Sequence, residues 1–481
     1  MSRRFFTASL PGLSDLAIAL LFVGAVWAAP LIADDPGVGW HLRTGQWISD
    51  HRQIPMTDMF LATSGGKRWI ANQWLSDLLF WKIFSWGSWP LLHVFVAILL
   101  VMPLAIISSQ RQAESSSDAS RFLAIILCGV VASVQWIIRP VVLSFVLFAA
   151  LYALLRRFER HAGIDWVALL GLIPLFIIWA NLHPGFPMGF ILIGCFVLGL
   201  LLDARIQLAI CLMLAAAAAL AVTLVNPYDL ELLRNIVALL KNNYFMSLNS
   251  EWKSPDFYNF ERIPFLLSLA LIAFYPPRTA SRGELASLAV FSALGLIAIR
   301  YIPFFALVAV VPLELSLRRI SLLRRLPVLS GSVGGYSMLC AVALFVTVIL
   351  RGDIPRLPPE ASAPSSQYPR SAIAKILSEP EPGTVFLSPD WGGFLAFNAY
   401  PRRIAFIDDR NELSGEELYR EYFDIVNARG NWRLKLAERE VSWILLFPSD
   451  LLSLALEGDA KWKLVGESET FKLFRRNDSA S

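Results

Sequence analysis

Long apolar blocks separated by short polar links dominate this sequence and restrict what it can fold into. A helix that spans a bilayer needs roughly 20 mostly apolar residues. We expect eleven such helices, at residues 14–33, 89–108, 122–138, 141–155, 164–180, 186–202, 206–225, 263–275, 285–299, 302–317 and 333–350. The composition agrees, because 56% of the 481 residues are hydrophobic, only 17% are charged and the mean hydropathy is +0.56. The sequence therefore predicts an α-helical polytopic membrane protein and excludes a soluble, disordered or disulfide-stapled chain.

The basic residues fall on alternate links between these blocks. Positive charges in short loops stay cytoplasmic, so we expect a cytoplasmic N-terminus and, with an odd number of spans, an extracytoplasmic C-terminus. Three polar segments then share the outer side, namely residues 34–88, residues 226–262 and everything after Gly352. The net charge of +4 is thus a topology signal, and we expect no nucleic-acid partner. The links assigned to the cytoplasm carry Arg3, Arg4, Arg111, Arg121, Arg156, Arg157, Arg160, Arg205, Arg278, Arg282 and the cluster at 318–325.

The chain divides into a membrane part and a tail. Residues 1–351 form the transmembrane domain, residues 352–370 are a Pro/Ser-rich linker, and residues 371–481 have the composition of a small soluble α/β domain. In the tail, TVFLS, RIAFID, VSWILLF, WKLVG and FKLFR read as strands, with helix-like stretches between them. Trp391-Gly392-Gly393 suits a tight strand-to-helix turn, and Asp408, Asp409 and Arg410 follow the next strand. We expect these loops to have a structural or carbohydrate-contacting role.

The first outer segment interleaves tryptophans with charged residues. Residues 40–50 and 72–84 are each typical of an amphipathic helix lying along the bilayer surface. Asp34 and Asp35 directly follow the first span, where partial desolvation can raise the pKa of a carboxylate and make it a better base. A simpler reading is that they only terminate the helix.

Four residues elsewhere on the outer side suit ligand binding. Arg139 and Arg300 lie where an apolar span meets the outer face, so each guanidinium either snorkels to lipid headgroups or binds an anion such as a phosphate. His183, in the link NLHPGF, can bind a metal or contact a sugar, or it can be a packed interfacial residue. Glu251 belongs to an acidic-aromatic cluster in the second outer segment, where surface solvation is the default role.

Sequence motifs of several enzyme classes are absent. The chain contains no HExxH, no paired CxxC and no Walker glycine loop. ATP-driven transport by this chain alone is therefore unsupported. A coupled carrier is also disfavoured, because we find no internal repeat of the spans and no charged residue near the middle of one.

Several motifs, in order along nearly the whole chain, resemble those of a group of bacterial polytopic membrane proteins. They are DDPGVGWHLRTGQWI, IPMTDMF, NQWLSDLLF, NLHPGF, LVNPYDLELL, SEWKSPDF, RYIPFFALVAVVPL and RRIAFIDDRNELSGEELYREY. That group is similar to the GT-C-type glycosyltransferases, membrane enzymes that move sugars from polyprenyl-phosphate donors on the outer face.

The resemblance implies a function and site residues. It implies sugar transfer from a polyprenyl-phosphate-linked donor to an outer-face glycan or lipid acceptor in the cell envelope, at the bacterial inner membrane. Asp34 or Asp35 matches the acidic general base of the first outer loop, with Asp58 as a second candidate. Arg139 and Arg300 would hold the lipid phosphate. A divalent metal is a further cofactor that some relatives use, with ligands to be drawn from Asp34, Asp35, His41 and His183.

The chain also departs from the pattern of this group. Gly37 and Gly39 stand where bulkier residues are expected, Gln73 replaces a carboxylate, and Asp35 is followed by Pro36 instead of forming an Asp-Glu pair. The alternative function is a non-catalytic lipid-binding or scaffold subunit of an envelope polysaccharide assembly system, whose tail domain docks a partner.

Overall fold

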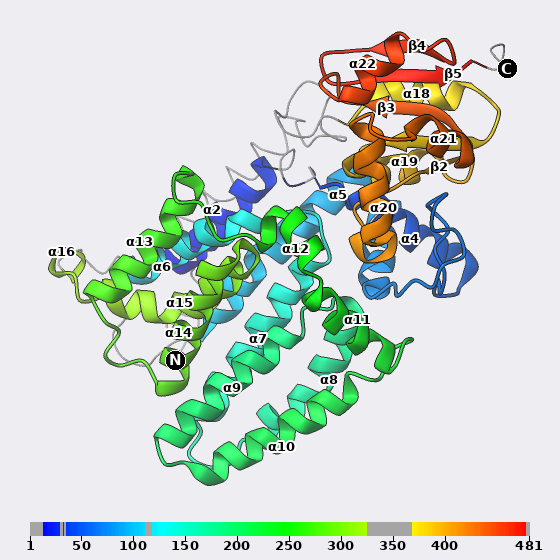
Figure 1. Cartoon of the computed structure of the whole chain (residues 1–481). Helices are drawn as coiled ribbons and strands as arrows, with labels where there is room; N and C mark the ends of the chain where they lie inside the picture. Colours follow the sequence, from blue (N-terminus) through cyan, green and yellow to red (C-terminus); the bar gives the residue numbers. More distant parts are fainter. Residues whose placement is uncertain (1–12, 29–31, 33–34, 111–117, 325–367, 478–481) are drawn as a thin grey trace. The chain divides into compact units, whose positions relative to one another are not determined.

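The chain is mostly helical, with one small sheet near its C-terminus (Figure 1). The computed structural model describes residues 13–28, 32, 35–110, 118–324 and 368–477. The chain divides into two compact units, which we describe separately. The helical unit comprises Met1–Ile32, His93–Leu230 and Met246–Pro355, and the α/β unit comprises Ala33–Leu92, Glu231–Phe245 and Arg356–Ser481.

Apolar helices make up the helical unit. Each of the predicted spans coincides with a helix, except residues 333–350, which lie outside the described residues. Three helices are long and apolar enough to cross a membrane, namely Trp74–Ser109, Val141–Arg160 and Ile299–Leu317, and the total of eleven spans stays a prediction. The helices of this unit are α2 (Leu13–Trp27), the C-terminal part of α5 (Trp74–Ser109), α6 (Asp118–Ala132), α7 (Val141–Arg160), α8 (Trp166–Leu182), α9 (Pro187–Leu202), α10 (Ile206–Val222), α13 (Ile263–Phe274), α14 (Arg282–Ile297), α15 (Ile302–Leu317) and α16 (Ser321–Arg324). α11 (Leu230–Lys241) belongs to the α/β unit from Glu231 onward, and α12 (Asn243–Leu248) is divided between the two units after Phe245.

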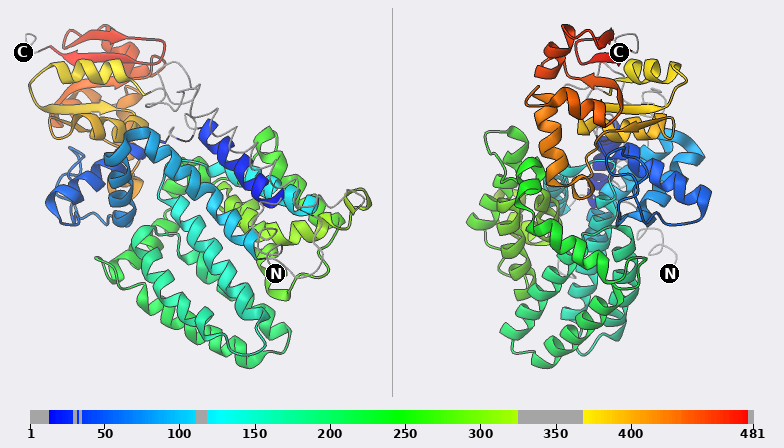
Figure 2. Two further views of the ribbon diagram at one scale, coloured as in Figure 1. Left: turned by 180° about the vertical axis from the view of Figure 1, so that it is seen from behind. Right: turned by 45° about the vertical axis from the view of Figure 1, so that its right-hand side comes forward.

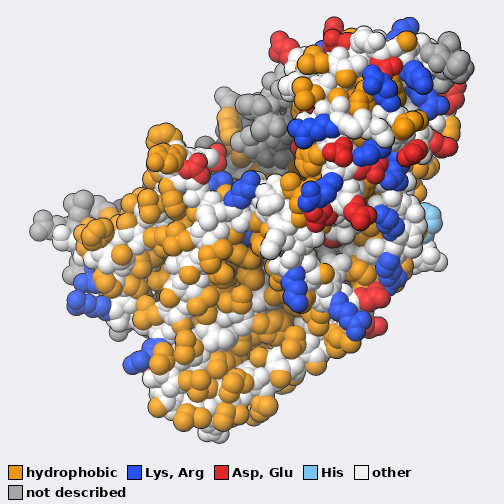
Figure 3. Space-filling view, in the orientation of Figure 1, with side chains coloured by type: hydrophobic (Ala, Val, Ile, Leu, Met, Phe, Trp, Pro, Cys, Tyr) orange, Lys and Arg blue, Asp and Glu red, His pale blue; other side chains and the backbone are white. Residues whose placement is uncertain are grey.

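The surface over α8, α9 and α10 is that of a protein in contact with lipid. These helices lie side by side in all three ribbon views (Figures 1 and 2), and their outer faces expose large apolar side chains such as Val167, Leu170 and Leu214. Figure 3 shows a mostly hydrophobic surface over α9 and α10, whereas acidic and basic side chains are interspersed over the α/β unit. An apolar surface of this extent is unfavourable in water and favourable in a bilayer.

Three links of the helical unit gather at one end of it. Arg157 after α7 pairs with Asp165 before α8 at 2.6 Å, and Arg282 at the start of α14 pairs with Asp203 after α9 at 2.7 Å. A guanidinium nitrogen of Arg205 donates to the backbone carbonyl oxygen of Glu159. These are links that the distribution of basic residues assigns to one side of the membrane.

A five-stranded sheet forms the centre of the α/β unit. Its strands are β1 (Gly383–Leu387), β2 (Arg403–Ala405), β3 (Val441–Leu446), β4 (Trp462–Glu467) and β5 (Lys472–Arg476), in the order β2-β1-β3-β5-β4. β1 is parallel to β2 and to β3, whereas β5 is antiparallel to β3 and β4. The helices are α18 (Arg370–Ser378), α19 (Pro389–Ala399), α20 (Asn411–Val426), α21 (Trp432–Glu438) and α22 (Leu451–Glu457). The apolar strand runs of the tail sequence therefore correctly locate all five strands.

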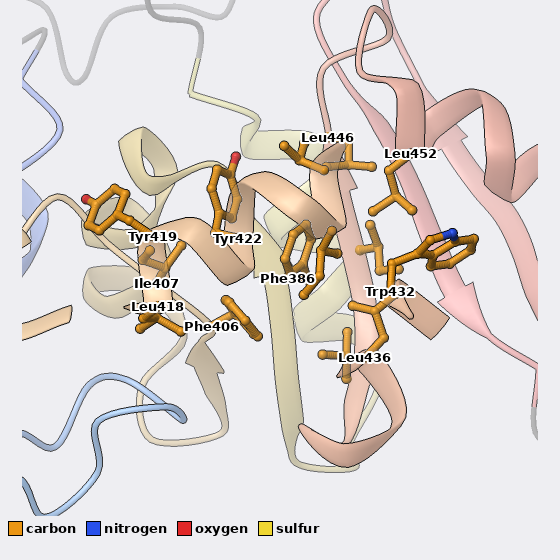
Figure 4. Packing of buried hydrophobic residues seen from close by; sticks show 14 of the residues in the cluster. Phe386, Phe406, Ile407, Leu418, Tyr419, Tyr422, Trp432, Leu436, Leu446 and Leu452 are labelled. Atoms are coloured by element: carbon orange, nitrogen blue, oxygen red, sulfur yellow. The ribbon is translucent and has the colours of Figure 1, made fainter. Parts of the chain in front are cut away.

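Aromatic and aliphatic side chains from the sheet and from α20, α21 and α22 form the core of this unit (Figure 4). Phe386 of β1 stacks on Tyr422 of α20 with ring centroids 5.4 Å apart, and Phe406 packs edge-on against Phe386 at 5.0 Å. Residues 385–387 of β1 and every residue of β3 except Ser442 are buried, as is typical of strands inside an α/β sheet.

The first outer segment belongs to the same unit as the tail. α4 (Val38–His51) and the start of α5, up to a kink at Gly87 and Ser88, are the two helices predicted there. Leu61 pairs with Ala405 as a parallel bridge, and the amide of Ala62 donates to the Ala405 carbonyl oxygen at 2.9 Å. The segment thereby extends the β2 edge of the sheet, so a loop near the N-terminus completes a C-terminal fold.

Gly39 of α4 and Gly393 of α19 explain how closely these two helices pack. A Cβ atom on Gly39 would lie 2.1 Å from the carbonyl oxygen of Gly393, and one on Gly393 would lie 2.3 Å from the carbonyl oxygen of Pro36. The small residues that depart from the expected pattern therefore allow two helix backbones to touch. The predicted turn at Trp391-Gly392-Gly393 is wrong, because these residues lie inside α19, which begins at Pro389 directly after Ser388.

Candidate functional site

Arg139 is held at the junction between α6 and α7. α6 ends at Ala132, a short 3-10 turn covers Ser133–Gln135, and Pro140 caps α7, so the chain around Arg139 is not helical. Nη1 of Arg139 lies 2.7 Å from Oε1 of Glu251, and both side chains are about one quarter exposed, at 25% and 24%. The side-chain amide nitrogen of Gln135, Nε2, donates to the other carboxylate oxygen of Glu251 at 3.2 Å.

Glu251 lies on a short 3-10 turn, η2 (Ser250–Trp252), within the second outer segment. The side-chain oxygen of Asn249 accepts a hydrogen bond from the Glu251 amide at 3.0 Å and so fixes the start of the turn. Burial raises the pKa of Glu251, but the positive charges of Arg139 and Arg300 outweigh burial and bring the pKa below its usual value. The carboxylate is therefore ionised at neutral pH.

Arg300 enters the same region from the junction between α14 and α15. It lies in the 3-10 turn η4 (Ile299–Tyr301), and the amide of Ile299 donates to the Lys253 carbonyl oxygen at 3.1 Å, which ties η4 to the loop of Glu251. The Arg300 guanidinium carbon stands 3.9 Å from the ring centroid of Trp252, a cation–π stack. Among the residues that the structure describes, no carboxylate forms an ion pair with Arg300.

His183 lies in the link between α8 and α9. Its Nδ1 accepts a hydrogen bond from the Gly185 amide at 2.9 Å and lies 2.8 Å from Oγ of Ser144, which itself accepts a hydrogen bond from Trp179 at 2.8 Å. Burial, reinforced by the charges of Arg300 and Arg139, lowers the pKa of His183 to about 3. His183 is therefore neutral with its proton on Nε2, an arrangement that favours a hydrogen-bond donor over a metal ligand.

Together these groups create a positive region at one end of the helical unit. Within the described part of the chain, Glu251 pairs with Arg139 and interacts electrostatically with Arg300, and the imidazole nearby is neutral. The two guanidiniums suit an anion such as a phosphate, which arginine binds through charge-assisted hydrogen bonds. The structure thus brings together Arg139, Arg300, Glu251 and His183, four of the residues that the sequence singles out.

The remaining candidates lie in the α/β unit. Asp34 lies outside the described residues. Asp35 is buried, its Oδ1 accepts a hydrogen bond from the Gly37 amide at 2.9 Å, and its carbonyl oxygen accepts one from the Tyr368 hydroxyl at 2.7 Å. The Asp35 carboxylate thus stabilises the turn that leads into α4.

His41 and Asp58 also form buried pairs. Nδ1 of His41 lies 2.6 Å from Oδ1 of Asp77, so the pair links α4 to the first half of α5. Asp58 lies 2.9 Å from Nη1 of Arg410, whose Nη2 is 2.7 Å from Asp408. Both side chains therefore stabilise the α/β unit through buried ion pairs or hydrogen bonds.

Aromatic rings enclose Arg410. Its guanidinium carbon lies 4.7 Å from the ring centroid of Trp69, 5.4 Å from that of Phe60 and 5.5 Å from that of Trp40. Burial alone would lower the pKa of Arg410, but the two carboxylates raise it above its usual value. The guanidinium is a permanent cation held between the Asp58 and Asp408 carboxyl groups.

The described residues contain no group of three or more His, Cys, Asp or Glu side chains placed to hold a metal ion. His41 and His183 each use Nδ1 for a contact within their own unit. The proposed metal ligands therefore do not form a metal site within this part of the chain.

Comparison with known proteins gives a result for structure and none for sequence. The chain matches no protein-family model and no curated protein. The oligosaccharyltransferase of Archaeoglobus fulgidus in its apo form aligns with a TM-score of 0.57 and 12% identity, over 90% of this chain and 69% of that one. ArnT from Cupriavidus metallidurans bound to undecaprenyl phosphate aligns with a TM-score of 0.54 and 13% identity, over 96% of this chain and 98% of that one. Both are GT-C-type glycosyltransferases.

This chain has a GT-C-type fold. The same archaeal enzyme in complex with Zn and sulfate aligns with a TM-score of 0.58 and 14% identity, over 89% of this chain and 68% of that one. At these identities the likeness establishes the arrangement of the chain, and the resemblance deduced from the sequence motifs is confirmed at that level.

Sequence reasoning missed two residues of the GT-C-like helical unit and one of the α/β unit. Gln135 and Trp252 contact the candidate residues Glu251 and Arg300, and Asp77 is the partner of His41. A signal for Gln135 was present, because it is a polar residue at the end of an apolar span, four positions before Arg139. No local sequence pattern marks Asp77, because its pairing with His41 depends on how α4 and α5 pack against each other.

Proposed function

We propose that this protein is an integral membrane glycosyltransferase. It moves a sugar from a polyprenyl-phosphate-linked donor to an outer-face glycan or lipid acceptor. The observation that carries the proposal is the alignment over 96% of this chain and 98% of ArnT, a protein whose structure holds undecaprenyl phosphate. The GT-C resemblance of the sequence motifs is independent of that alignment and agrees with it.

The arginines of the helical unit support the phosphate-binding half of this proposal. In the transfer, the bond between the sugar and the donor phosphate oxygen breaks, and the acceptor oxygen forms the new bond to the sugar. Negative charge develops on the departing polyprenyl phosphate, and Arg139 and Arg300 would stabilise it. Both guanidiniums keep their positive charge at any physiological pH, so they can stabilise the departing phosphate.

A carboxylate of the first outer loop would accept the proton of the acceptor hydroxyl. Asp34 and Asp35 are the candidates from the resemblance. Because Asp35 is buried and already holds the Gly37 amide, the two positions should be substituted separately as well as together.

Membrane topology is part of the proposal. We infer a multi-pass protein of the bacterial inner membrane, with a cytoplasmic N-terminus and an extracytoplasmic tail. The gathering of Arg157, Arg205 and Arg282 at one end of the helical unit supports this orientation, since Arg139 and Arg300 lie at the opposite ends of α7 and α14. Labelling of single cysteines placed at Arg282 and at Tyr258 with a membrane-impermeant reagent tests this orientation. From outside the cell, the cysteine at position 258 should be labelled and the cysteine at position 282 should not. Labelling of position 282 alone would show the reverse orientation.

Binding of undecaprenyl phosphate to the purified protein in lipid nanodiscs tests the function. The wild type should bind saturably, and Arg139→Ala and Arg300→Ala should each weaken binding. Asp34→Asn and Asp35→Asn should leave binding intact, and the variant that loses the base should lose sugar transfer in a subsequent donor screen. Arg282→Ala is the matched control, because its ion pair is exposed and the 16-residue helix α14 separates it from Arg300. Absence of saturable binding to the wild type would favour the non-catalytic scaffold instead.

A further inference from the structure

Glu251 occupies the position that an anionic ligand of the two arginines would need. Its Oε1 lies 2.7 Å from Nη1 of Arg139, a distance typical of a charge-assisted hydrogen bond to any oxyanion. It is also the carboxylate whose charge interacts with Arg300 across the same region. A phosphate oxygen and the Glu251 carboxylate cannot both occupy that position on Arg139.

We propose that Glu251 is a resident anion that competes with the phosphate of the lipid ligand, and that binding requires its side chain to swing away from Arg139. This inference rests on the proposed function and deepens it, because it assigns the same site a built-in competitor.

The local structure permits this exchange without rearranging the backbone. Asn249 holds the Glu251 amide, and the Lys253 carbonyl oxygen holds the Ile299 amide, so the turn is fixed by contacts that do not use the carboxylate. The carboxylate itself is held by the ion pair with Arg139 and by a hydrogen bond from the side-chain amide of Gln135. It is about one quarter exposed, at 24%, and its side chain has several rotatable bonds, so rotation toward water is open to it.

The position of Trp252 distinguishes the two arginines in this exchange. Arg300 is stacked on the Trp252 ring and has no described carboxylate partner, so it is ready to receive an oxyanion. Departure of the Glu251 carboxylate opens the position at Nη1 of Arg139 to an oxygen of the ligand. The apparent affinity for phosphate is then the intrinsic affinity multiplied by the fraction of molecules in which Glu251 has moved.

Titration of wild type and Glu251→Gln with undecaprenyl phosphate in phosphatidylcholine nanodiscs tests the inference. Zwitterionic lipid avoids competition from anionic headgroups. Glutamine keeps the size of the residue and one acceptor oxygen but removes the charge, so the variant should bind about three- to tenfold more tightly. Gln135→Leu frees one oxygen of Glu251 and should tighten binding in the same direction but less, which keeps the test valid if Glu251→Gln folds poorly.

Two controls isolate competition from a general change in charge. Glu261→Gln removes an exposed carboxylate of the same outer segment and should change affinity by less than about twofold. Undecaprenol, which lacks the phosphate, should bind wild type and Glu251→Gln equally. Inorganic phosphate in the same titration shows whether the arginines recognise the phosphate alone or only with its lipid.

The outcomes separate failure of this inference from failure of the proposed function. If wild type binds undecaprenyl phosphate and Glu251→Gln binds equally or more weakly, Glu251 does not compete and the inference is overturned. If wild type fails to bind but Glu251→Gln binds, competition is supported in its strongest form. If neither binds, the proposed function fails and the inference falls with it.

Discussion

Two arginine clusters, one in each unit, differ in how deeply their guanidiniums are buried and in what surrounds them. In the α/β unit, one guanidinium, that of Arg410, meets two carboxylates and three aromatic rings, and no part of its side chain is exposed. In the helical unit, Arg139 pairs with Glu251 and its side chain is one quarter exposed, while Arg300 stacks on the Trp252 ring. A fully buried arginine between two carboxyl groups stabilises the fold, whereas partly exposed arginines remain accessible to an anion.

The two clusters give different roles to Asp58 and Glu251, which have similar positions in the sequence pattern. Asp58 and Glu251 are both acidic residues of outer segments, and both were candidates for binding substrate. Asp58 joins the first outer segment to the loop after β2 through Arg410, while Glu251 borders the positive region of the helical unit. Only the second arrangement leaves an arginine within reach of a ligand.

The largest expected effect comes from breaking the sealed cluster. Arg410→Met leaves Asp58 and Asp408 buried without their cation, which should cost about 3–5 kcal/mol of the stability of the α/β unit. Hydrogen exchange should then rise over residues 56–69 and 403–410. Arg420→Met, which removes an exposed pair with Glu416 in α20, is the control and should leave the stability nearly unchanged. Normal protection combined with lost ligand binding would instead make Arg410 a ligand-binding residue.

The sequence predicts more of the fold than of these clusters, for a physical reason. Span positions follow from hydropathy and tail strands from short apolar runs, which are local properties of the chain. The Asp58–Arg410 pair joins residues 352 positions apart, since 410 − 58 = 352, and no local pattern encodes it. Arg139 and Arg300 were identifiable because a charge at the rim of an apolar span is locally anomalous, but the pairing of Arg139 with Glu251 depends on tertiary packing.

A second prediction concerns the neutral imidazole beside the exposed arginines. The folded-state pKa of His183 is about 3, well below its ordinary value of 6.5, so the folded state binds fewer protons than the unfolded state between these values. Stability should therefore fall as pH falls through this window, by on the order of 2 kcal/mol between pH 6.5 and pH 5. The free energy of unfolding of His183→Asn, whose Oδ1 can replace Nδ1 as acceptor, should lack this component. Equal pH dependence in both proteins would contradict a buried neutral His183.

A third prediction sharpens the role of Arg300 within the exposed cluster. Arg300→Lys keeps the charge but loses the flat stack on Trp252, so undecaprenyl phosphate should bind about fivefold more weakly, or about 1 kcal/mol. Arg300→Gln, which also loses the charge, should bind more weakly still, and Arg282→Lys should match the wild type. A lysine variant that equals the wild type would show that charge alone, without the stack, recognises the ligand.

The smallest effect is expected from the ion pair of the exposed cluster itself. Because Arg139 and Glu251 are about one quarter exposed, their pair should contribute only about 0.5–1 kcal/mol at pH 7, far less than the sealed cluster. The pKa of Glu251 is lowered in the folded state, so this contribution is present above the usual value of 4.5 and is lost as pH falls through the folded-state pKa. The difference in free energy of unfolding between wild type and Glu251→Gln should therefore stay constant from pH 8 to pH 5.5 and shrink below about pH 4.5, a window distinct from that of His183. A difference of several kcal/mol at pH 7 would mean that Glu251 is an internal tie like Asp58, and the contrast between the two clusters would disappear.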